Sequence, residues 1–222
     1  MNIRHKFYQK QFDKLSQDRI EKVQNEMFSN IEQLKVKMIG YLSALNDGVI
    51  AIFITVMMLE IPYPTSNQDY HTFLWSVAVF LISFFIIADF WYNNKRIFQT
   101  IQEADHTVVV ADFLFLASLA LIPVTTKWIM NGVDRYATVH FGIVYFITIL
   151  MHQYLFFSGM RKLFDNNMGL FLRVIFTHTG IILAVDALLI LVGWFYPRQA
   201  TILFIALPII NFFMPDRRSK KS

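Results

Sequence analysis

Acidic and amide side chains occur near the ends of stretches that are otherwise apolar. Asp47, Asp89 and Asp112 each stand close to one end of such a stretch. A charge within a membrane-spanning segment costs free energy, so it marks either a functional site or a side chain that reaches the interface. We expect these carboxylates to lie at similar depth on the inner side of a membrane, in one network with neighbouring amides. The predicted network consists of Asn46, Asp47, Asp89, Asn93, Asn94 and Asp112.

His178 and Asp186 lie deeper inside an apolar stretch. They are eight residues apart, which is a little over two helical turns, so they share one face of a helix approximately. Two interpretations are open. The pair could make hydrogen bonds that pack helices together, or it could act as a relay that moves protons through the membrane.

The sequence contains no residue pattern typical of an enzyme. It has no His-x-x-x-His pair, no phosphate-binding glycine loop and no serine in a nucleophile elbow. It also has no cysteine, which excludes disulfides, thiolate metal sites and cysteine nucleophiles. We therefore expect no catalytic residue, no metal site and no cofactor.

Six apolar stretches can place these polar residues in membrane-spanning helices. Hydrophobic residues make up 55% of the 222 residues, charged residues make up 16%, and the mean hydropathy is +0.44. Soluble domains carry about 25% charged residues, and crossing a membrane takes about 20 apolar residues. The predicted fold is therefore an all-α membrane protein with six transmembrane helices. The spans are 42–62, 73–92, 108–128, 138–157, 170–194 and 200–214, the last containing Pro208.

The positive charges predict how these spans are oriented. Most of the 20 Lys and Arg residues lie in the two tails and in the loops after the second and fourth spans. Only Lys127, Arg135 and Arg198 lie in the alternate loops. Because cytosolic segments carry the excess of Lys and Arg, both termini are predicted to be cytosolic. This distribution accounts for the net charge of +4 without a nucleic-acid partner.

The segment before the first span has a helical, amphipathic pattern. Three interpretations are open: it packs under its own membrane domain, it associates between subunits, or it lies on anionic lipid. We expect a cytosolic helix over 1–40, a transmembrane domain over 41–215 and a basic cytosolic tail over 216–222. The apolar residues of the pattern are Phe12, Leu15, Ile20, Val23, Met27, Ile31, Leu34 and Met38.

The first span carries a distinctive motif. Asp47 and the stretch Ala51-Ile52-x-x-Thr55 resemble the signature Arg-x-x-x-Phe-Ser-Asp followed by Ala-Ile-x-x-Thr of the transmembrane protein 175 family. This family comprises endolysosomal potassium channels and their bacterial relatives. Tyr41, Leu45 and Asn46 replace the Arg, Phe and Ser of the signature. The similarity continues at Ser83-Phe84-Phe85, Phe90-Trp91, Arg96-Ile97-Phe98 and Leu121-Ile122-Pro123, with Asn93-Asn94 where bacterial members often have histidines.

The resemblance implies a potassium-permeable leak channel in a prokaryotic plasma membrane. In that family four six-helix subunits assemble, and their first helices line a central pore that lacks a carbonyl selectivity filter. By this resemblance Ile52 forms the constriction, and Val56 and Leu59 form apolar layers further out. Thr55 offers a hydroxyl to a partly dehydrated ion. The spacing agrees, since positions i, i+4 and i+7 share one helix face.

Two other functions remain open at this point. A proton-coupled transporter or proton leak would use Asp47, His178 and Asp186. A non-conducting scaffold would present the N-terminal helix. For the channel, the expected partners are further copies of the chain, the lipid bilayer and permeant potassium ions.

Overall fold

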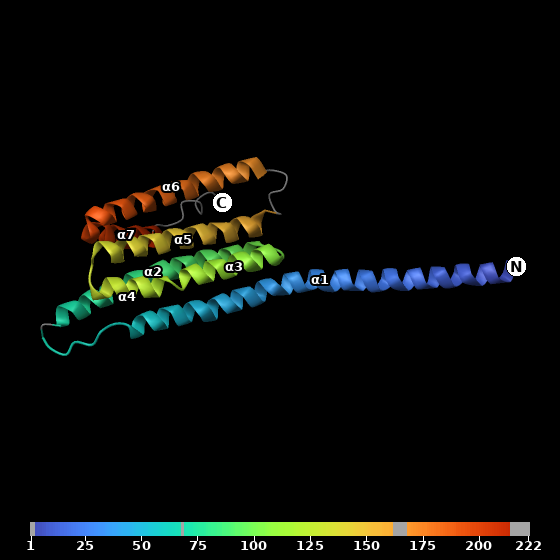
Figure 1. Ribbon diagram of the computed structural model, residues 1–222, viewed down its shortest axis with the longest axis horizontal. Coiled ribbons are helices and arrows are strands. Elements are labelled where there is room, and N and C mark those ends of the chain that lie inside the picture. Colours follow the sequence, from blue (N-terminus) through green and yellow to red (C-terminus); the bar gives the residue numbers. More distant parts are fainter. Residues whose placement is uncertain (1–2, 68, 162–167, 214–222) are drawn as a thin grey trace.

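The computed structural model describes residues 3–67, 69–161 and 168–213, and every regular element in these ranges is an α-helix (Figure 1). Side chains are described within residues 17–206, apart from 18, 68, 162–168, 170–172, 174–176, 178 and 205. The predicted tail 216–222 lies outside the described residues. The helices are α1 (Ile3–Leu59), α2 (Tyr70–Thr100), α3 (His106–Leu119), α4 (Ile122–Asn131), α5 (Arg135–Met160), α6 (Met168–Phe195) and α7 (Pro197–Phe213).

Four helical segments in the described ranges are long and apolar enough to cross a membrane. They are Arg19–Leu59 in α1, the whole of α2, the pair α3 and α4 taken together, and α5. The apolar part of α6, Thr179–Phe195, is shorter. α7 has 17 residues, so the total of six spans stays a prediction.

The predicted third span is one apolar segment, His106–Asn131, that consists of two helices. α3 ends at Leu119 and α4 begins at Ile122, with Pro123 in its first turn. Proline has no N–H to donate, and its ring collides with the carbonyl four residues earlier, which here belongs to Leu119. The hydrogen-bond ladder therefore breaks just before the proline. Asp105 begins α3 by accepting a hydrogen bond from the Val108 N–H (3.0 Å).

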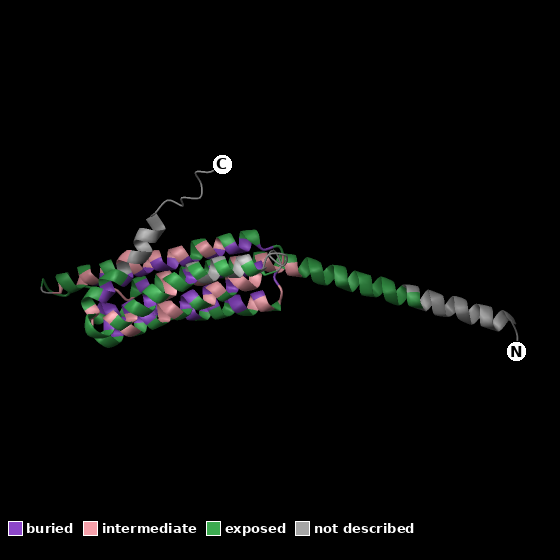
Figure 2. Cartoon of the chain, turned by 90° about the horizontal axis from the view of Figure 1, so that it is seen from above, coloured by how far each residue is buried: buried purple, intermediate pink, exposed green. Residues whose placement is uncertain are grey.

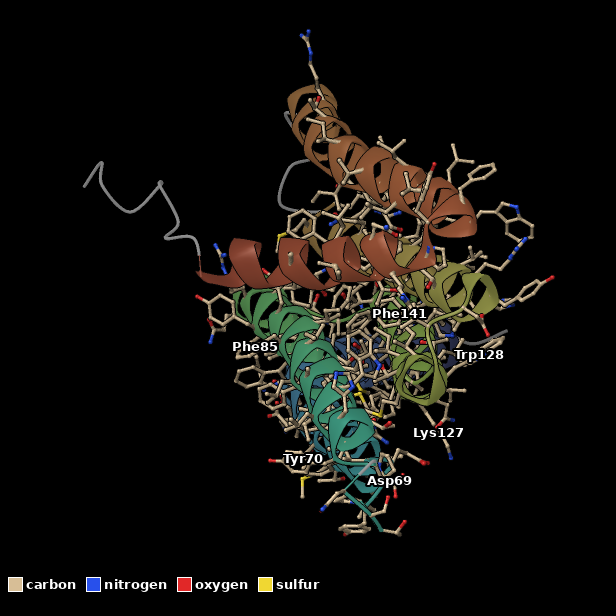
Figure 3. The ribbon with its side chains drawn as sticks, turned by 90° about the vertical axis from the view of Figure 1, so that its left-hand side faces the viewer. Asp69, Tyr70, Phe85, Lys127, Trp128 and Phe141 are labelled. Carbon is tan, nitrogen blue, oxygen red and sulfur yellow. The ribbon has the colours of Figure 1, made fainter. Side chains whose placement is uncertain are left out.

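The helices form a bundle in which α1 and α6 lie on opposite sides (Figure 1). α1 packs on α2, α3 and α4, whereas α5 contacts α3, α4, α6 and α7. In the end-on view of Figure 3, α7 lies across the bundle, where the rings of Phe204 and Phe141 are 6.0 Å apart. Gly142 allows this close approach, because a Cβ at this position would lie only 2.6 Å from Ile190 and 2.7 Å from Phe204.

α1 extends far beyond the bundle at its N-terminal end (Figures 1 and 2). Residues 19–34 are all exposed, so this part of the helix is not packed under its own membrane domain. Contact with the bundle begins at Lys35, whose carbonyl accepts a hydrogen bond from the Ala104 N–H (3.0 Å) and whose ammonium lies 3.9 Å from Glu103. The helix continues without a break through residue 40, so the domain boundary expected there stays a prediction.

Candidate functional site

α1 has two different faces in its membrane half. Leu42 and Met57 are buried against the bundle, with 3% and 1% of their surface exposed. Ile52, Val56 and Leu59 are turned away from this packed side and keep 58%, 43% and 79% of their surface exposed. Their spacing of i, i+4 and i+7 puts these three residues on one side of the helix. We call the second set the free face of α1.

Thr55 adjoins the free face and is exposed. Its hydroxyl donates a hydrogen bond to the carbonyl of Ile52, 2.9 Å away in the same helix. The hydroxyl proton is used within the helix, but the hydroxyl oxygen keeps lone pairs that can accept a further interaction. The side chain can therefore present an oxygen to a cation next to the free face.

A buried polar cluster joins α1, α2 and α3. Asn46, Asn94 and Asp112 are each at most 1% exposed. The Asn46 Nδ2 lies 2.8 and 3.0 Å from the two carboxylate oxygens of Asp112, and 2.9 Å from the Leu42 carbonyl. The Asn94 Nδ2 donates to the Asn46 Oδ1 at 2.7 Å. Asn46 therefore links both neighbouring helices to α1.

A second, half-exposed polar cluster lies beside the first. The indole N–H of Trp91 donates to the Asp47 Oδ1 (2.8 Å), and the ammonium of Lys95 lies 2.6 Å from the Asp47 Oδ2. Lys95 also donates to the Ser43 hydroxyl at 2.8 Å. Trp91 and Lys95 are four residues apart and share one face of α2. Sequence reasoning missed both as partners of Asp47; the helical spacing was the signal that could have identified them.

The single network predicted from the sequence is therefore divided. Asp47 is not part of the buried cluster, because Asn94 donates to Asn46 within that cluster whereas Asp47 pairs with Lys95. Asn93 donates to the Asp89 carbonyl in its own helix (2.9 Å). Neighbouring residues differ by about 100° around a helix, so equal depth does not put them on the same face.

Two polar side chains of α5 and α6, His152 and Asp186, are deeply buried. Asp186 is 3% exposed, and neither oxygen of its carboxylate has a hydrogen-bond partner among the described residues. The side chain of His178 lies outside the described residues, so a relay between the two stays a prediction. His152, not chosen from the sequence as a site residue, is 8% exposed and packs its ring 5.7 Å from Phe90 and 5.1 Å from Phe115.

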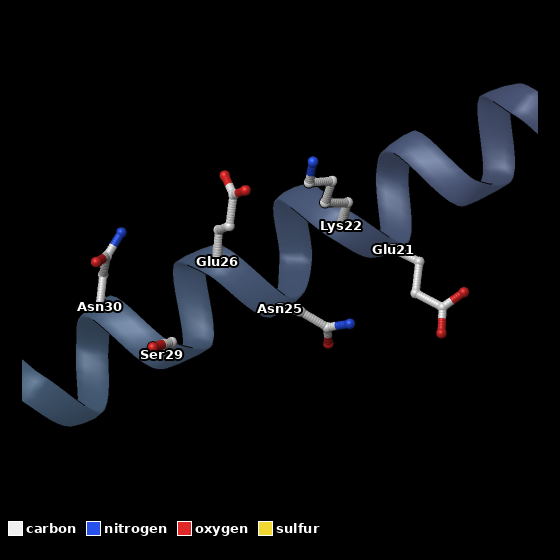
Figure 4. Close-up of a pocket in the computed structure, with 6 residues that line it drawn as sticks. All are labelled: Glu21, Lys22, Asn25, Glu26, Ser29 and Asn30. Atoms are coloured by element: carbon white, nitrogen blue, oxygen red, sulfur yellow. The ribbon is translucent and has the colours of Figure 1, made fainter.

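The described residues contain no group of three or more His, Cys, Asp and Glu side chains that could hold a metal ion. Figure 4 shows a polar surface on the exposed part of α1. On this surface Lys22 and Glu26 are four residues apart and therefore lie one turn apart along the helix. All of its residues belong to one helix. This surface is therefore a solvated helix face and not an enclosed binding site.

Comparison with known proteins finds a family whose sequences are similar to a segment that includes the membrane half of α1. Residues 41–123 match the family model of the endosomal/lysosomal potassium channel TMEM175. A potassium channel of Chryseobacterium sp. (strain P1-3) is 28% identical over 197 residues, which cover 82% of this chain and 96% of the relative. The chain is therefore similar to the TMEM175 family over residues 41–123. A potassium channel of Chamaesiphon minutus is 31% identical over 128 residues, covering 51% of this chain and 63% of that relative.

A solved TMEM175 structure has the same fold. It is the crystal structure of a lysosomal potassium-selective channel TMEM175 homologue from Chamaesiphon minutus, with a TM-score of 0.65 and 20% sequence identity. The similarity covers 80% of this chain and 100% of that one. The family and the apolar helices together make this chain a multi-pass membrane protein. The resemblance seen in the sequence is therefore confirmed.

The segment matched by the TMEM175 model contains the free face of α1 and both polar clusters. Every residue of these three features lies between positions 41 and 123. Asp186 and His178 lie outside the matched segment. The part of the chain that is similar to TMEM175 thus contains the free face of α1 and the side chains that attach the other face of α1 to α2 and α3.

Proposed function

We propose that the chain is one subunit of a homotetrameric, potassium-permeable leak channel whose pore is lined by the free face of α1. One observation carries the proposal. Within the segment that matches TMEM175, α1 buries one face against its own bundle and leaves the other, with Ile52 and Leu59, exposed. Closed rotational symmetry would bring the free faces of identical subunits around one axis.

The composition of the free face favours neighbouring helices over lipid as its environment. Gly48 and Thr55 are both exposed on this side, and a Cβ at Gly48 would meet no atom within 4 Å. Small and hydroxyl residues are enriched where membrane helices approach one another closely. A surface that only faces lipid needs neither.

The proposed pore would restrict ions with side chains and not with a carbonyl cage. α1 is helical up to Leu59, so its backbone carbonyls up to Thr55 accept hydrogen bonds within the helix. An ion passing a ring of Ile52 side chains loses water that no carbonyl replaces, and such an apolar ring gates by dewetting. Val56 and Leu59 add apolar layers, and Thr55 supplies hydroxyl oxygens.

The polar clusters would hold α1 in position for this role. Asn46 and Asp47 tie the end that we place in the cytosol to α2 and α3. At the other end, Glu60 and Lys127 form an ion pair of 2.7 Å between the end of α1 and α4. Both termini are cytosolic in this proposal, and the membrane is a prokaryotic plasma membrane, as the distribution of Lys and Arg and the bacterial relatives suggest.

Flux through purified protein in liposomes tests the proposal. Ile52→Asn should raise potassium flux and weaken discrimination against sodium, because a polar ring stays wet; lowering the barrier by about 1.4 kcal/mol gives about tenfold in rate. Val56→Asn should act in the same direction to a smaller extent. Leu188→Asn is the matched control, since Leu188 is 59% exposed on α6, on the other side of the bundle.

Two results would refute the channel. Unchanged flux and selectivity in an assembled Ile52→Asn protein would remove the free face from the pore. No flux of either ion through the wild-type protein would favour a non-conducting scaffold.

A proton leak or proton-coupled transporter is the second candidate function. The observation in its favour is the buried carboxylate of Asp186, which has no hydrogen-bond partner among the described residues. An internal pH dye in the same liposomes would detect proton entry. Asp186→Asn should abolish that entry if this residue carries protons, and it should leave potassium flux unchanged if the channel proposal is correct.

A further inference from the structure

The apolar stripe on the projecting part of α1 continues the free face of the membrane half. Moving from Ile20 to Leu59, exposed or half-buried positions recur at steps of three or four residues, with a mean of about 3.5, the spacing of a coiled-coil seam. We call these positions the α1 seam. Its members are Ile20, Val23, Met27, Ile31, Leu34, Met38, Tyr41, Leu45, Gly48, Ile52, Thr55 and Leu59.

From Ile20 to Leu34 the seam has no partner in a single subunit, whereas Met38 packs against the subunit's own core. Five of its apolar side chains, from Ile20 to Leu34, keep between 45% and 60% of their surface exposed. No break separates this part from the membrane half, since α1 is one helix over Ile3–Leu59 and continues out of the bundle (Figures 1 and 2). An apolar stripe of this kind on an exposed helix is a surface for association.

The period of the seam determines which partner fits it. On a straight α-helix, residues that repeat every seven positions shift around the helix axis by about 20° per heptad. When several helices wind into a left-handed supercoil, the residues of the repeat stay on the side that faces the neighbouring helices. If the membrane halves surround one axis, the supercoil keeps the same seam facing that axis beyond the membrane. A lipid surface would instead require α1 to bend at the membrane.

Charge on α1 is consistent with contact between identical copies. Identical subunits bring identical side chains together around the axis, so a charged residue in the seam would repel its own copies. No seam position from Ile20 to Met38 is charged. The polar residues of Figure 4, among them Glu21, Lys22 and Glu26, lie around the other side of the helix.

We propose that residues 20–38 of α1 form a parallel helical bundle with the same segment of the other subunits, on the axis of the pore. This inference rests on the proposed function, because the membrane halves supply the axis. A segment of 19 residues is about 28 Å long, and an isolated coiled coil of this size is weak. Attachment to assembled membrane domains raises the effective concentration of the segments and makes the bundle stable.

Cysteine cross-linking tests this surface without any background mutation, because the chain has no cysteine. Ile31→Cys places a thiol in the seam, and Ser29→Cys places one on the polar face of the same exposed helix. Both proteins are reconstituted in liposomes, assayed for potassium flux and then oxidised. A disulfide needs Cα atoms about 4.4–6.8 Å apart, so Ile31→Cys should give covalent dimers and Ser29→Cys should give none above background.

Each alternative outcome has its own meaning. Normal flux with no cross-linking at position 31 overturns the seam bundle and leaves the channel proposal intact. No flux together with a monomeric mass in detergent overturns both. An environment-sensitive dye on Ile31→Cys that shifts to the blue only when lipid is added, in protein that does not cross-link, assigns the stripe to the membrane surface and overturns the seam bundle.

Discussion

Replacing Asn46 with Ala should destabilise the protein far more than replacing its neighbour Asp47. Asn46 donates to both carboxylate oxygens of Asp112 and accepts from Asn94, and all three side chains are buried. The alanine variant removes these hydrogen bonds without opening the site to water. The Asp112 carboxylate and the Asn94 amide then lose their partner on α1.

The magnitude follows from the number of buried groups that lose a hydrogen bond to Asn46. A buried polar group that loses its hydrogen bond costs about 1–3 kcal/mol, and a charged group costs more. Two such groups, one of them a carboxylate, give an expected loss of about 3–5 kcal/mol in the free energy of unfolding. Asp47→Ala breaks a pair in which 48% of the Asp47 side chain is exposed, and pairs of this kind contribute about 0–1 kcal/mol.

Equilibrium unfolding in mixed detergent micelles measures both variants under identical conditions, with helix content as the signal. Asn46→Ala combined with Asp112→Ala completes a double-mutant cycle. The double variant should lose less stability than the sum of the single losses, by about 0.5–3 kcal/mol, because residues in contact are coupled. Equal losses in Asn46→Ala and Asp47→Ala, or additive losses in the double variant, would show that the buried cluster does not hold α1.

Three further outcomes follow from packing, topology and assembly. Gly142→Ala should lower stability by about 1–3 kcal/mol through overpacking against Ile190 and Phe204, whereas Gly180→Ala, with no atom within 4 Å, should be neutral or slightly stabilising. A tag beside Asn67 should be labelled from outside intact cells and a C-terminal reporter should stay in the cytosol; labelling of the tag only after permeabilisation would contradict this topology. In mild detergent the mass should equal four subunits of 26.1 kDa, and a mass of only one or two subunits would contradict the tetramer.

Much of the candidate site could be predicted because membrane insertion acts on short-range properties. Hydropathy predicted the spans 42–62, 73–92 and 138–157, where the structure has the end of α1 up to Leu59, α2 and α5. Helical spacing placed Ile52, Val56 and Leu59 on one face. The structure also brings together three of the six residues of the predicted network, Asn46, Asn94 and Asp112. Each of these inferences depends on composition, depth or the period of one helix.

The errors arose where rotation about a helix axis decides the outcome. Asn46 and Asp47 are neighbours at the same depth, yet one is buried against Asp112 and the other is half exposed beside Lys95. Sequence spacing gives the angle between them but not which one faces the bundle. The predicted third span is confirmed as one segment long enough to cross a membrane, but its division into α3 and α4 at Pro123 was not predicted.

The sequence by itself determined the membrane class, the apolar helices and the resemblance to the TMEM175 family, because hydropathy and motif are properties of short segments. The orientation that the charges indicate stays a prediction. Only the tertiary structure decided which face of α1 is packed and which is free. In a membrane both faces are apolar and lipid is as apolar as a helix surface, so hydrophobicity does not choose between them. Packing and buried hydrogen bonds determine which face of α1 is packed, and their partners, such as Asn94 and Asp112, are distant in sequence.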